Sequence, residues 1–228
     1  MVDVLEKSER YTTETAGEYA LRAIKEQIIS LRLKPDTMIS EKIFATELGI
    51  SRTPVREALN NLSQTGIIDI IPQTGIYITK IDHNLVEEAR FLRLQLELGV
   101  VKKICSDESP IDLLKLEQNI KLQEFYMLND DLDNFFALDN KFHELLFHYA
   151  KKPQSYQIMK HMQIHFDRVR RLNLESMDEA VELLNDHKNI YQALMKKDVE
   201  KSRALVRLHL SRYEIDRKYL ESKYYEYF

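Results

Sequence analysis

Residues 40–62 contain a glycine and a proline that divide the segment into two short helices, and this division limits the folds open to the chain. Ser40 can cap the first helix, and Gly49 can adopt the left-handed conformation that ends it. Thr53 is the expected N-cap of the second helix, with Pro54 at its first position, where a missing N–H leaves no hydrogen bond unmade. The pattern predicts two helices joined by a tight turn.

The flanking segments complete a small domain over residues 14–80. Apolar residues at helical spacing predict an earlier helix over residues 15–33. β-rich runs on either side of a turn at residues 72–75 predict a hairpin. Helices followed by a two-stranded wing make a winged helix-turn-helix, which a polar, flexible segment over residues 1–13 precedes.

Arg52 and Arg56 stand one turn apart at the start of the second short helix. A helix-turn-helix places this helix in the major groove of DNA, where an arginine can donate to guanine O6 and N7. Ser51, Thr53 and the helix N-terminus suit phosphate oxygens, and Lys42 on the preceding helix can also reach the DNA. The alternative is that both arginines only solubilise a surface helix. The turn, the start signal and the hairpin together favour DNA binding.

Residues 81–228 form a second domain with helical patterns throughout. The connections are short, with breaks near Pro110 and Ser176 among others, which predicts an antiparallel bundle of about six to seven helices and a mainly α chain. The expected helices span residues 83–106, 110–128, 131–150, 153–174, 178–197 and 198–223.

Polar residues interrupt the apolar stripes of this bundle at four places. Asp139 and His143 share one helix face, and His187 and His209 occupy core positions on two other helices. Burying such groups without partners costs several kcal/mol. A carboxylate and neutral imidazoles suit a divalent metal ion, Zn²⁺ with Ni²⁺ or Mn²⁺ as alternatives. Each histidine alone is more simply a hydrogen-bonded core residue, but their coincidence on facing helices favours a metal site.

Two further features leave alternatives open. His161 and His165 form another pair one turn apart, and we expect them to flank the pocket or to face solvent. The aromatic tail over residues 223–228 docks on a partner subunit, packs on its own bundle or is disordered.

The run LKPDTMISEKIFATELGISRTPVREALNNLSQTGIIDIIPQTGIYI resembles the winged-helix domain of GntR-family transcription regulators, and SRTPVREAL is its most specific part. In that family the residues at Arg52, Thr53 and Arg56 contact the operator, and the position of Lys42 is often basic. The wing tip is associated with the minor groove, and Thr74 stands where many relatives carry a basic residue. Motif and resemblance together give the expected DNA-binding residues as Lys42, Ser51, Arg52, Thr53, Arg56, Gln73, Thr74 and Gly75.

The second domain is similar to the FCD-type effector domain of the FadR subfamily. The pattern Asp139-x-x-x-His143, followed by His187 and His209, carries this likeness. In metal-containing members the residues at these positions bind the ion, and a carboxylate metabolite completes its coordination. The resemblance therefore implies that a small acid is the effector.

Arg93 matches an Arg-x-x-x-Glu pattern that is frequent in this kind of domain. A guanidinium offers two parallel donors to a carboxylate, so Arg93 is the candidate to bind the effector acid. The alternative is a salt bridge with Glu97 or Glu88.

Composition adds limits on location and on DNA binding. The single cysteine, Cys105, excludes an intrachain disulfide framework, and no apolar run approaches the roughly 20 residues of a membrane span, so we expect a cytoplasmic protein. The 33 basic and 37 acidic residues give a net charge of −4. A DNA-binding surface must therefore be a local basic patch.

We expect a sequence-specific transcription regulator whose operator binding responds to a small carboxylate at a metal site, and the resemblance favours a repressor. A homodimer on a palindromic operator is expected, because one winged helix reads too few base pairs to find a single genomic site. Repacking of the helices over 83–106 and 198–223 would carry the signal. The alternatives are a metal-ion sensor and a metal-dependent hydrolase. We expect no enzyme, because the nearest candidate base, Glu144, points about 100° away from His143 around the helix.

Replacing Arg52 or Arg56 by alanine should lower the discrimination between operator and unrelated DNA by about 1–3 kcal/mol, because each variant loses a bidentate contact to a guanine. Fluorescence anisotropy with operator and scrambled duplexes at one salt concentration measures this difference. Circular dichroism should show the parent's helical content. If both variants discriminate like the parent, the DNA-reading helix lies elsewhere.

Overall fold

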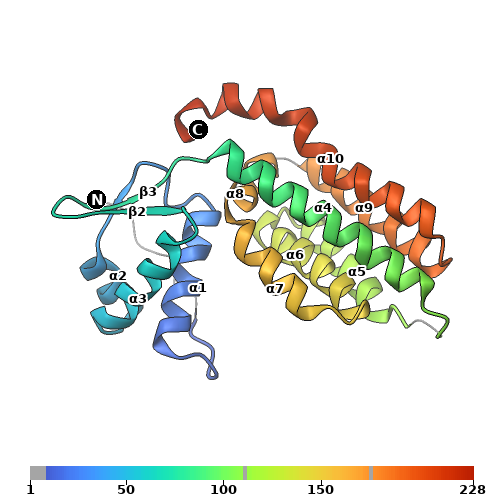
Figure 1. Cartoon of the computed structure of the whole chain (residues 1–228), viewed down its shortest axis with the longest axis horizontal. Coiled ribbons are helices and arrows are strands. Elements are labelled where there is room, and N and C mark those ends of the chain that lie inside the picture. Colours follow the sequence, from blue (N-terminus) through green and yellow to red (C-terminus); the bar gives the residue numbers. More distant parts are fainter. Residues whose placement is uncertain (1–8, 110–111, 175–176) are drawn as a thin grey trace.

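The computed structural model describes residues 9–109, 112–174 and 177–228. They fold into a small N-terminal domain and a larger helical bundle, which lie side by side (Figure 1). The breaks expected at Pro110 and Ser176 lie outside the described residues.

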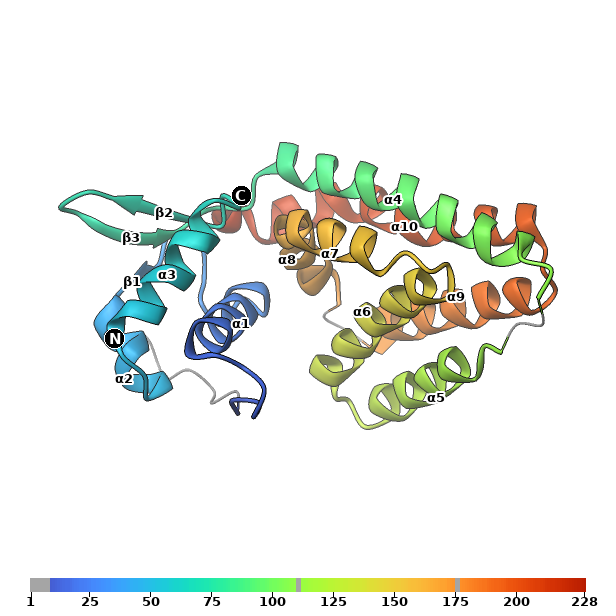
Figure 2. The same ribbon diagram turned by 60° about the horizontal axis from the view of Figure 1, so that its bottom comes forward.

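The N-terminal domain is a winged helix-turn-helix, as the sequence predicts. Its β2–β3 hairpin projects away from the bundle as a wing (Figure 2). A short strand that the sequence analysis missed, β1, pairs with β3, so the antiparallel sheet has the order β1-β3-β2. The elements are α1 (Ala16–Ile29), β1 (Met38–Ile39), α2 (Glu41–Leu48), α3 (Arg52–Ser63), β2 (Ile68–Ile71) and β3 (Gly75–Ile78).

The first helix is shorter than expected. A capping box between Thr15 and Glu18 starts α1, but the helix ends at Ile29 and Leu31 adopts a left-handed backbone with φ 61°. The early end turns the chain so that Leu33 is buried in the domain core.

The turn between α2 and α3 differs in detail from the prediction. Gly49 ends α2 in the left-handed conformation with φ 66°, as predicted. Ser51, and not Thr53, is the N-cap of α3, so Arg52 is its first helical residue and Pro54 its third. Pro54 is still tolerated there, because the first-turn N–H groups of a helix have no intrahelical acceptor.

The bundle consists of helices that pack largely antiparallel around a main apolar core, with a smaller apolar cluster between α4, α8 and α10 (Figures 1 and 2). The helix expected over residues 153–174 is divided at Gln163 into two, α7 and α8. Within the described ranges, every helix is too short or too polar to cross a bilayer. The elements are α4 (His83–Ser106), α5 (Leu114–Leu128), α6 (Leu132–Tyr149), α7 (Pro153–Met162), α8 (Ile164–Asn173), α9 (Met177–Met195), α10 (Val199–Lys223) and the short 3₁₀ helix η1 (Tyr225–Tyr227).

Helix α8 joins the two domains. Ile164, its first residue, is part of the apolar core of the N-terminal domain. The buried Arg168 guanidinium donates to the carbonyl oxygens of Thr79 (2.7 Å) and Lys80 (3.0 Å), in the linker between wing and bundle. The winged helix is therefore held against the bundle by hydrogen bonds as well as by apolar contact.

His165 is also part of this junction, so the expectation that it flanks the pocket or faces solvent is wrong. Its Nδ1 accepts from the backbone N–H of Asp82 (3.2 Å), which leaves Nε2 to donate to the carbonyl oxygen of Gly66 (3.2 Å). Burial and the nearby Arg168 charge lower the pKa of His165 to about 4, so the ring is neutral at pH 7. His161 is exposed to solvent.

The aromatic tail packs on its own chain at the same junction. The backbone N–H of Ile81 donates to Tyr227 O (2.7 Å), and the Phe228 ring stacks on His83 with centroids 4.8 Å apart. The chain end thus lies beside the linker between the domains (Figure 2).

Candidate functional site

The polar residues that interrupt the bundle stripes meet in its core. Asp139 and His143 come from α6, His187 from α9 and His209 from α10. One ligand atom from each lies within 4.8 Å of the others, and all four side chains are buried. The helical spacing therefore placed each of them on the correct inward face.

Each imidazole in this cluster has an acceptor at its Nδ1 atom. His143 Nδ1 lies 2.8 Å from a Glu97 carboxylate oxygen on α4, and His209 Nδ1 lies 3.2 Å from an Asp186 carboxylate oxygen. Ionised carboxylates only accept hydrogen bonds. These contacts favour the tautomer with the proton at Nδ1, in which a neutral ring carries its lone pair at Nε2.

The orientation of His187 depends on a buried amide. Gln123 Nε2 donates to Asn119 Oδ1 (2.6 Å), which directs Gln123 Oε1 toward His187 Nδ1 at 2.7 Å. A carbonyl oxygen only accepts, so His187 is also protonated at Nδ1.

The consequence is that unprotonated Nε2 atoms converge on one point. The Nε2 atoms of His143 and His209 are 3.2 Å apart, so in the tautomers that the Nδ1 contacts favour their lone pairs face one another. His187 Nε2 is buried, has no hydrogen-bond partner among the described residues, and lies 3.5 Å from an Asp139 oxygen. Burial lowers the pKa of His143 and takes that of His187 to about 3, which keeps these rings neutral.

These residues fit a divalent metal ion. Lone pairs that face one another beside a carboxylate repel unless a cation lies between them. Hydrogen bonds to the outer nitrogen are also how proteins orient metal-binding histidines. Neutral imidazoles with one carboxylate oxygen suit Zn²⁺, Ni²⁺ or Mn²⁺.

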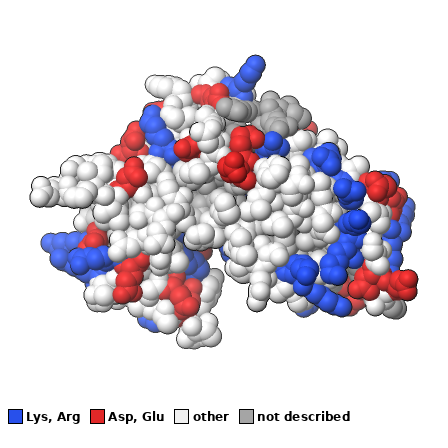
Figure 3. All heavy atoms as spheres, in the orientation of Figure 1, with Lys and Arg blue, Asp and Glu red and all other residues white. Residues whose placement is uncertain are grey.

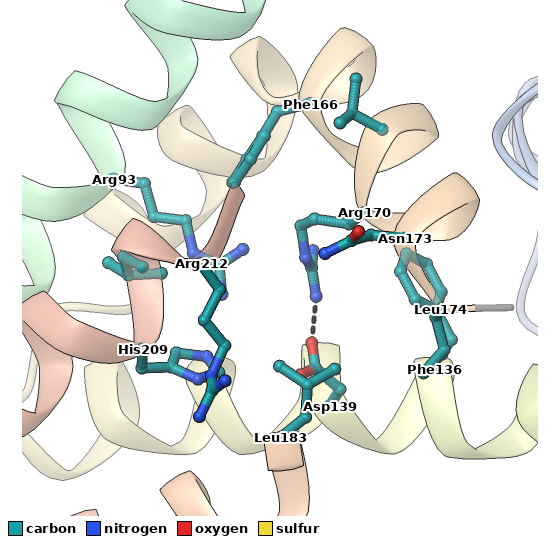
Figure 4. Close-up of a pocket in the computed structure, with 12 residues that line it drawn as sticks. Arg93, Phe136, Asp139, Phe166, Arg170, Asn173, Leu174, Leu183, His209 and Arg212 are labelled. Carbon is teal, nitrogen blue, oxygen red and sulfur yellow. Dashed lines mark hydrogen bonds and ion pairs between the residues drawn. The ribbon is translucent and has the colours of Figure 1, made fainter. Parts of the chain in front are cut away.

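Asp139 has a second partner in Arg170 on α8, which forms an ion pair with its other oxygen (Figure 4). Burial, the largest single influence, would raise the pKa of Asp139, but the combined effect of Arg170, the neighbouring histidines and Arg93 outweighs it, and the pKa is lowered. Arg170 also donates to Asn140 (2.8 Å) and Asp167 (2.7 Å). The cluster is thereby tied to the helix that joins the domains.

A pocket opens beside the cluster, and its roughly 560 Å³ of empty space is partly open to solvent. Figure 4 shows three arginines directed into it from different helices, Arg93 from α4, Arg170 from α8 and Arg212 from α10. Its remaining wall is mainly apolar and includes Phe136, Phe166, Val169, Leu174, Leu183 and Leu210.

The three arginines differ in how many of their donors are occupied. Arg170 is paired as described above, and Arg212 donates to Asp186 (2.6 and 2.9 Å) and to Glu182. Arg93 is 1% exposed and donates through Nε to Glu97 (2.7 Å), whereas its NH1 has no hydrogen-bond partner among the described residues. Arg93 therefore makes the salt bridge that the sequence suggested and still offers a donor in the pocket.

The predicted DNA-reading residues lie on one exposed surface. Lys42, Ser51, Arg52, Thr53 and Arg56 are exposed on α2 and at the start of α3. Figure 3 shows basic side chains gathered where these helices lie, with acidic side chains close by. The patch is local, as the net charge requires.

At the wing tip, Gln73 and Thr74 are exposed and Gly75 is partly exposed. Gln73 adopts a left-handed backbone with φ 62° to close the β2–β3 turn. No basic residue stands at the tip itself, over residues 72–75.

Sequence reasoning missed most partners of the candidate ligands. Asp186 directly precedes His187, and Gln123 is a polar residue on the buried face of α5, so both left a signal. Arg170 and Arg212 left none, because arginines are common on helix surfaces and only the fold turns these two inward.

Two family descriptions match the chain. "Bacterial regulatory proteins, gntR family" matches residues 17–78, and "FCD domain" matches residues 88–212.

Individual proteins are similar over most of the chain. It is 31% identical over 198 residues to the "HTH-type transcriptional repressor RspR" of Escherichia coli (strain K12), covering 87% of each protein. It is 25% identical over 204 residues to the "Gluconate operon transcriptional repressor" of Bacillus subtilis (strain 168), covering 86% of this chain and 82% of that protein. The solved structure of E. coli McbR/YncC, at 20% identity, covers 93% of this chain and 100% of that chain with a TM-score of 0.78, which shows the same fold.

Replacing Arg170 by methionine should destabilise the metal-free protein by about 3–5 kcal/mol, because it leaves the buried Asp139 carboxylate without its cation. The matched control is Arg171→Met, whose partner Asp133 is half exposed, and it should cost less than about 1 kcal/mol. Urea unfolding in the presence of a chelator measures both. Equal losses for the two variants would contradict the role of Arg170.

Proposed function

Because this chain belongs to the GntR family of bacterial regulatory proteins and carries an FCD domain, we propose that it is a metal-dependent transcription repressor that responds to a small carboxylate. The family makes it a DNA-binding transcription regulator and not an enzyme. The metal, the acid and the sign of the response are the parts that we propose.

The observation that carries the proposal is the convergence of buried Nε2 lone pairs beside a carboxylate. Asp139, His143, His187 and His209 would hold the ion, with Zn²⁺ the best match to their donors and Ni²⁺ or Mn²⁺ the alternatives. A bound divalent ion would supply a Lewis acid that a carboxylate oxygen of the effector can coordinate.

The pocket supports an acid as the effector. The NH1 group of Arg93 is buried without a partner, and an unpaired buried donor favours a ligand that accepts from it. The apolar wall and the limited volume favour a small molecule with a short carbon skeleton. Two relatives, RspR and the gluconate operon transcriptional repressor, are named as repressors, which supports repression.

Helix α8 provides a route from the pocket to the DNA. Phe166, Val169 and Arg170 line the pocket, while His165 and Arg168 on the same helix bond the linker and the wing base. An acid that binds one position of α8 more tightly than another would shift the winged helix with it. Helices α4 and α10, which the sequence analysis favoured for this role, both contact α8.

A homodimer on a palindromic operator remains part of the proposal. Exposed apolar side chains on the bundle, such as Phe91 on α4 (62% exposed) and Leu208 on α10 (52% exposed), are candidates for the surface between subunits.

The double variant His187→Ala/His209→Ala should bind no metal, because it removes half of the ligand set. Elemental mass spectrometry on protein purified without a tag or chelator should find about one ion per chain in the parent and in the control His148→Ala, whose imidazole is exposed on α6. Parent-like metal content in the double variant would place the ion elsewhere.

The variant Arg168→Met should uncouple the pocket from the DNA, because it removes both hydrogen bonds that α8 makes to the linker carbonyls. A panel of small metal-binding acids, screened by anisotropy on the operator, should contain one that releases the metal-loaded parent. That acid should still bind the variant in calorimetry but release it at least about tenfold less effectively, whereas the exposed control Arg207→Met should respond like the parent.

Two outcomes would contradict this scheme. An Arg168→Met protein that responds like the parent would exclude the route through α8. Operator affinity that follows free metal without any acid would instead indicate a metal-ion sensor.

A further inference from the structure

An acidic residue sits within the candidate DNA-reading surface and binds one of its arginines. Glu41 is the first residue of α2, and Arg56 is on the first turns of α3. Arg56 Nε donates to both Glu41 oxygens (3.0 and 3.2 Å), and NH2 donates to one of them (2.9 Å). The arginine side chain is 64% exposed and the glutamate side chain 25% exposed.

These bonds occupy one edge of the guanidinium and leave another free. Nε–H and one N–H of NH2 form the side edge of the planar fork, and Glu41 fills it. NH1 and the second N–H of NH2 form the end edge. That end edge presents the parallel donors that match guanine O6 and N7.

Glu41 is well held as a support. It lies in the first turn of α2, where the helix dipole favours a carboxylate. The hydrogen bonds from Arg56 lower the pKa of Glu41, so the group stays ionised at neutral pH.

A carboxylate at this place has an electrostatic cost for DNA binding. It repels nearby phosphates and so weakens sequence-independent affinity, which depends on positive charge. Arg56 without it would be a flexible side chain that reaches phosphates and bases of any sequence. With it, the plane of the guanidinium is set before DNA arrives, which lowers the entropy lost on forming a directional contact.

We propose that Glu41 is a positioning residue for operator recognition, which trades sequence-independent affinity for base discrimination by holding Arg56 with its end edge toward the major groove. The inference rests on the DNA-reading role of Arg56. Arg52 provides an internal comparison, because Glu41 bonds Arg56 and acts on Arg52 only through charge among the described residues.

The test uses the full-length protein and operator duplexes in which each guanine is replaced in turn. The guanine read by Arg56 is the one whose replacement lowers the affinity of the parent but not that of Arg56→Ala. The guanine read by Arg52 is identified in the same way with Arg52→Ala. If Arg56→Ala leaves every base preference unchanged, the reading role itself fails, which is a separate result from any outcome for Glu41.

Glu41→Gln should lower discrimination at the Arg56 guanine by about tenfold, raise affinity for unrelated DNA by a few-fold, and leave discrimination at the Arg52 guanine unchanged. Glu41→Asp keeps the charge but shortens the reach, so it should lower discrimination without raising affinity for unrelated DNA. The control Glu47→Gln removes a charge from the same helix and should leave base discrimination as in the parent. In the Arg56→Ala background, Glu41→Gln should change no base preference.

If Glu41 only repels DNA, Glu41→Gln should bind every duplex more tightly and discriminate between bases as the parent does, because only a charge is lost. If Glu41 instead holds Arg56 away from the bases, Glu41→Gln should increase discrimination at the Arg56 guanine. Either result would overturn the proposal. Circular dichroism and thermal unfolding should be parent-like for all variants, because the pair is at the surface.

Discussion

The hydrogen bonds to the outer nitrogens of the buried histidines are the constraint on which the bundle depends. Glu97, Asp186 and Gln123 each accept from an Nδ1 atom, so the Nε2 lone pairs of His143, His187 and His209 have to face inward. An apolar core would tolerate less exact placement of its helices, because it has no donors or acceptors that must be paired. Here α4, α5, α6, α9 and α10 must be arranged so that each acceptor meets its ring. The resulting cluster of nitrogen lone pairs beside a carboxylate favours the binding of a cation.

The same constraint explains why α8 is well placed to transmit a signal. Its Arg170 pairs with the Asp139 oxygen that does not face His187, and its Arg168 donates to the linker carbonyls. A change in the charge or volume of the pocket therefore acts on a helix whose side chains bond both the candidate site and the linker. Packed interiors respond to such changes by moving between discrete arrangements, because they have little free volume.

The candidate DNA-reading surface combines few positive charges with a nearby carboxylate. The chain carries a net charge of −4, and a carboxylate lies against one of the arginines that would read bases. Such a surface gives little affinity for DNA in general, so recognition has to come from a few well-oriented contacts. Two copies on a palindrome would then supply the affinity that one copy lacks.

The sequence by itself determined most helices and strands and the candidate ligands. The tertiary structure decided which side chains contact one another. Period 3.6 placed Asp139, His143, His187 and His209 inward, and the Gly49 turn with the following hairpin indicated the winged helix, because both signals are local. The early end of α1, strand β1, the break at Gln163 and the junction role of His165 were not predicted. Strand β1 and the junction role of His165 depend on neighbours far away in the chain. The partners of the ligands and of Arg56 were missed for the same reason, since a hydrogen bond between helices leaves no periodicity in either one.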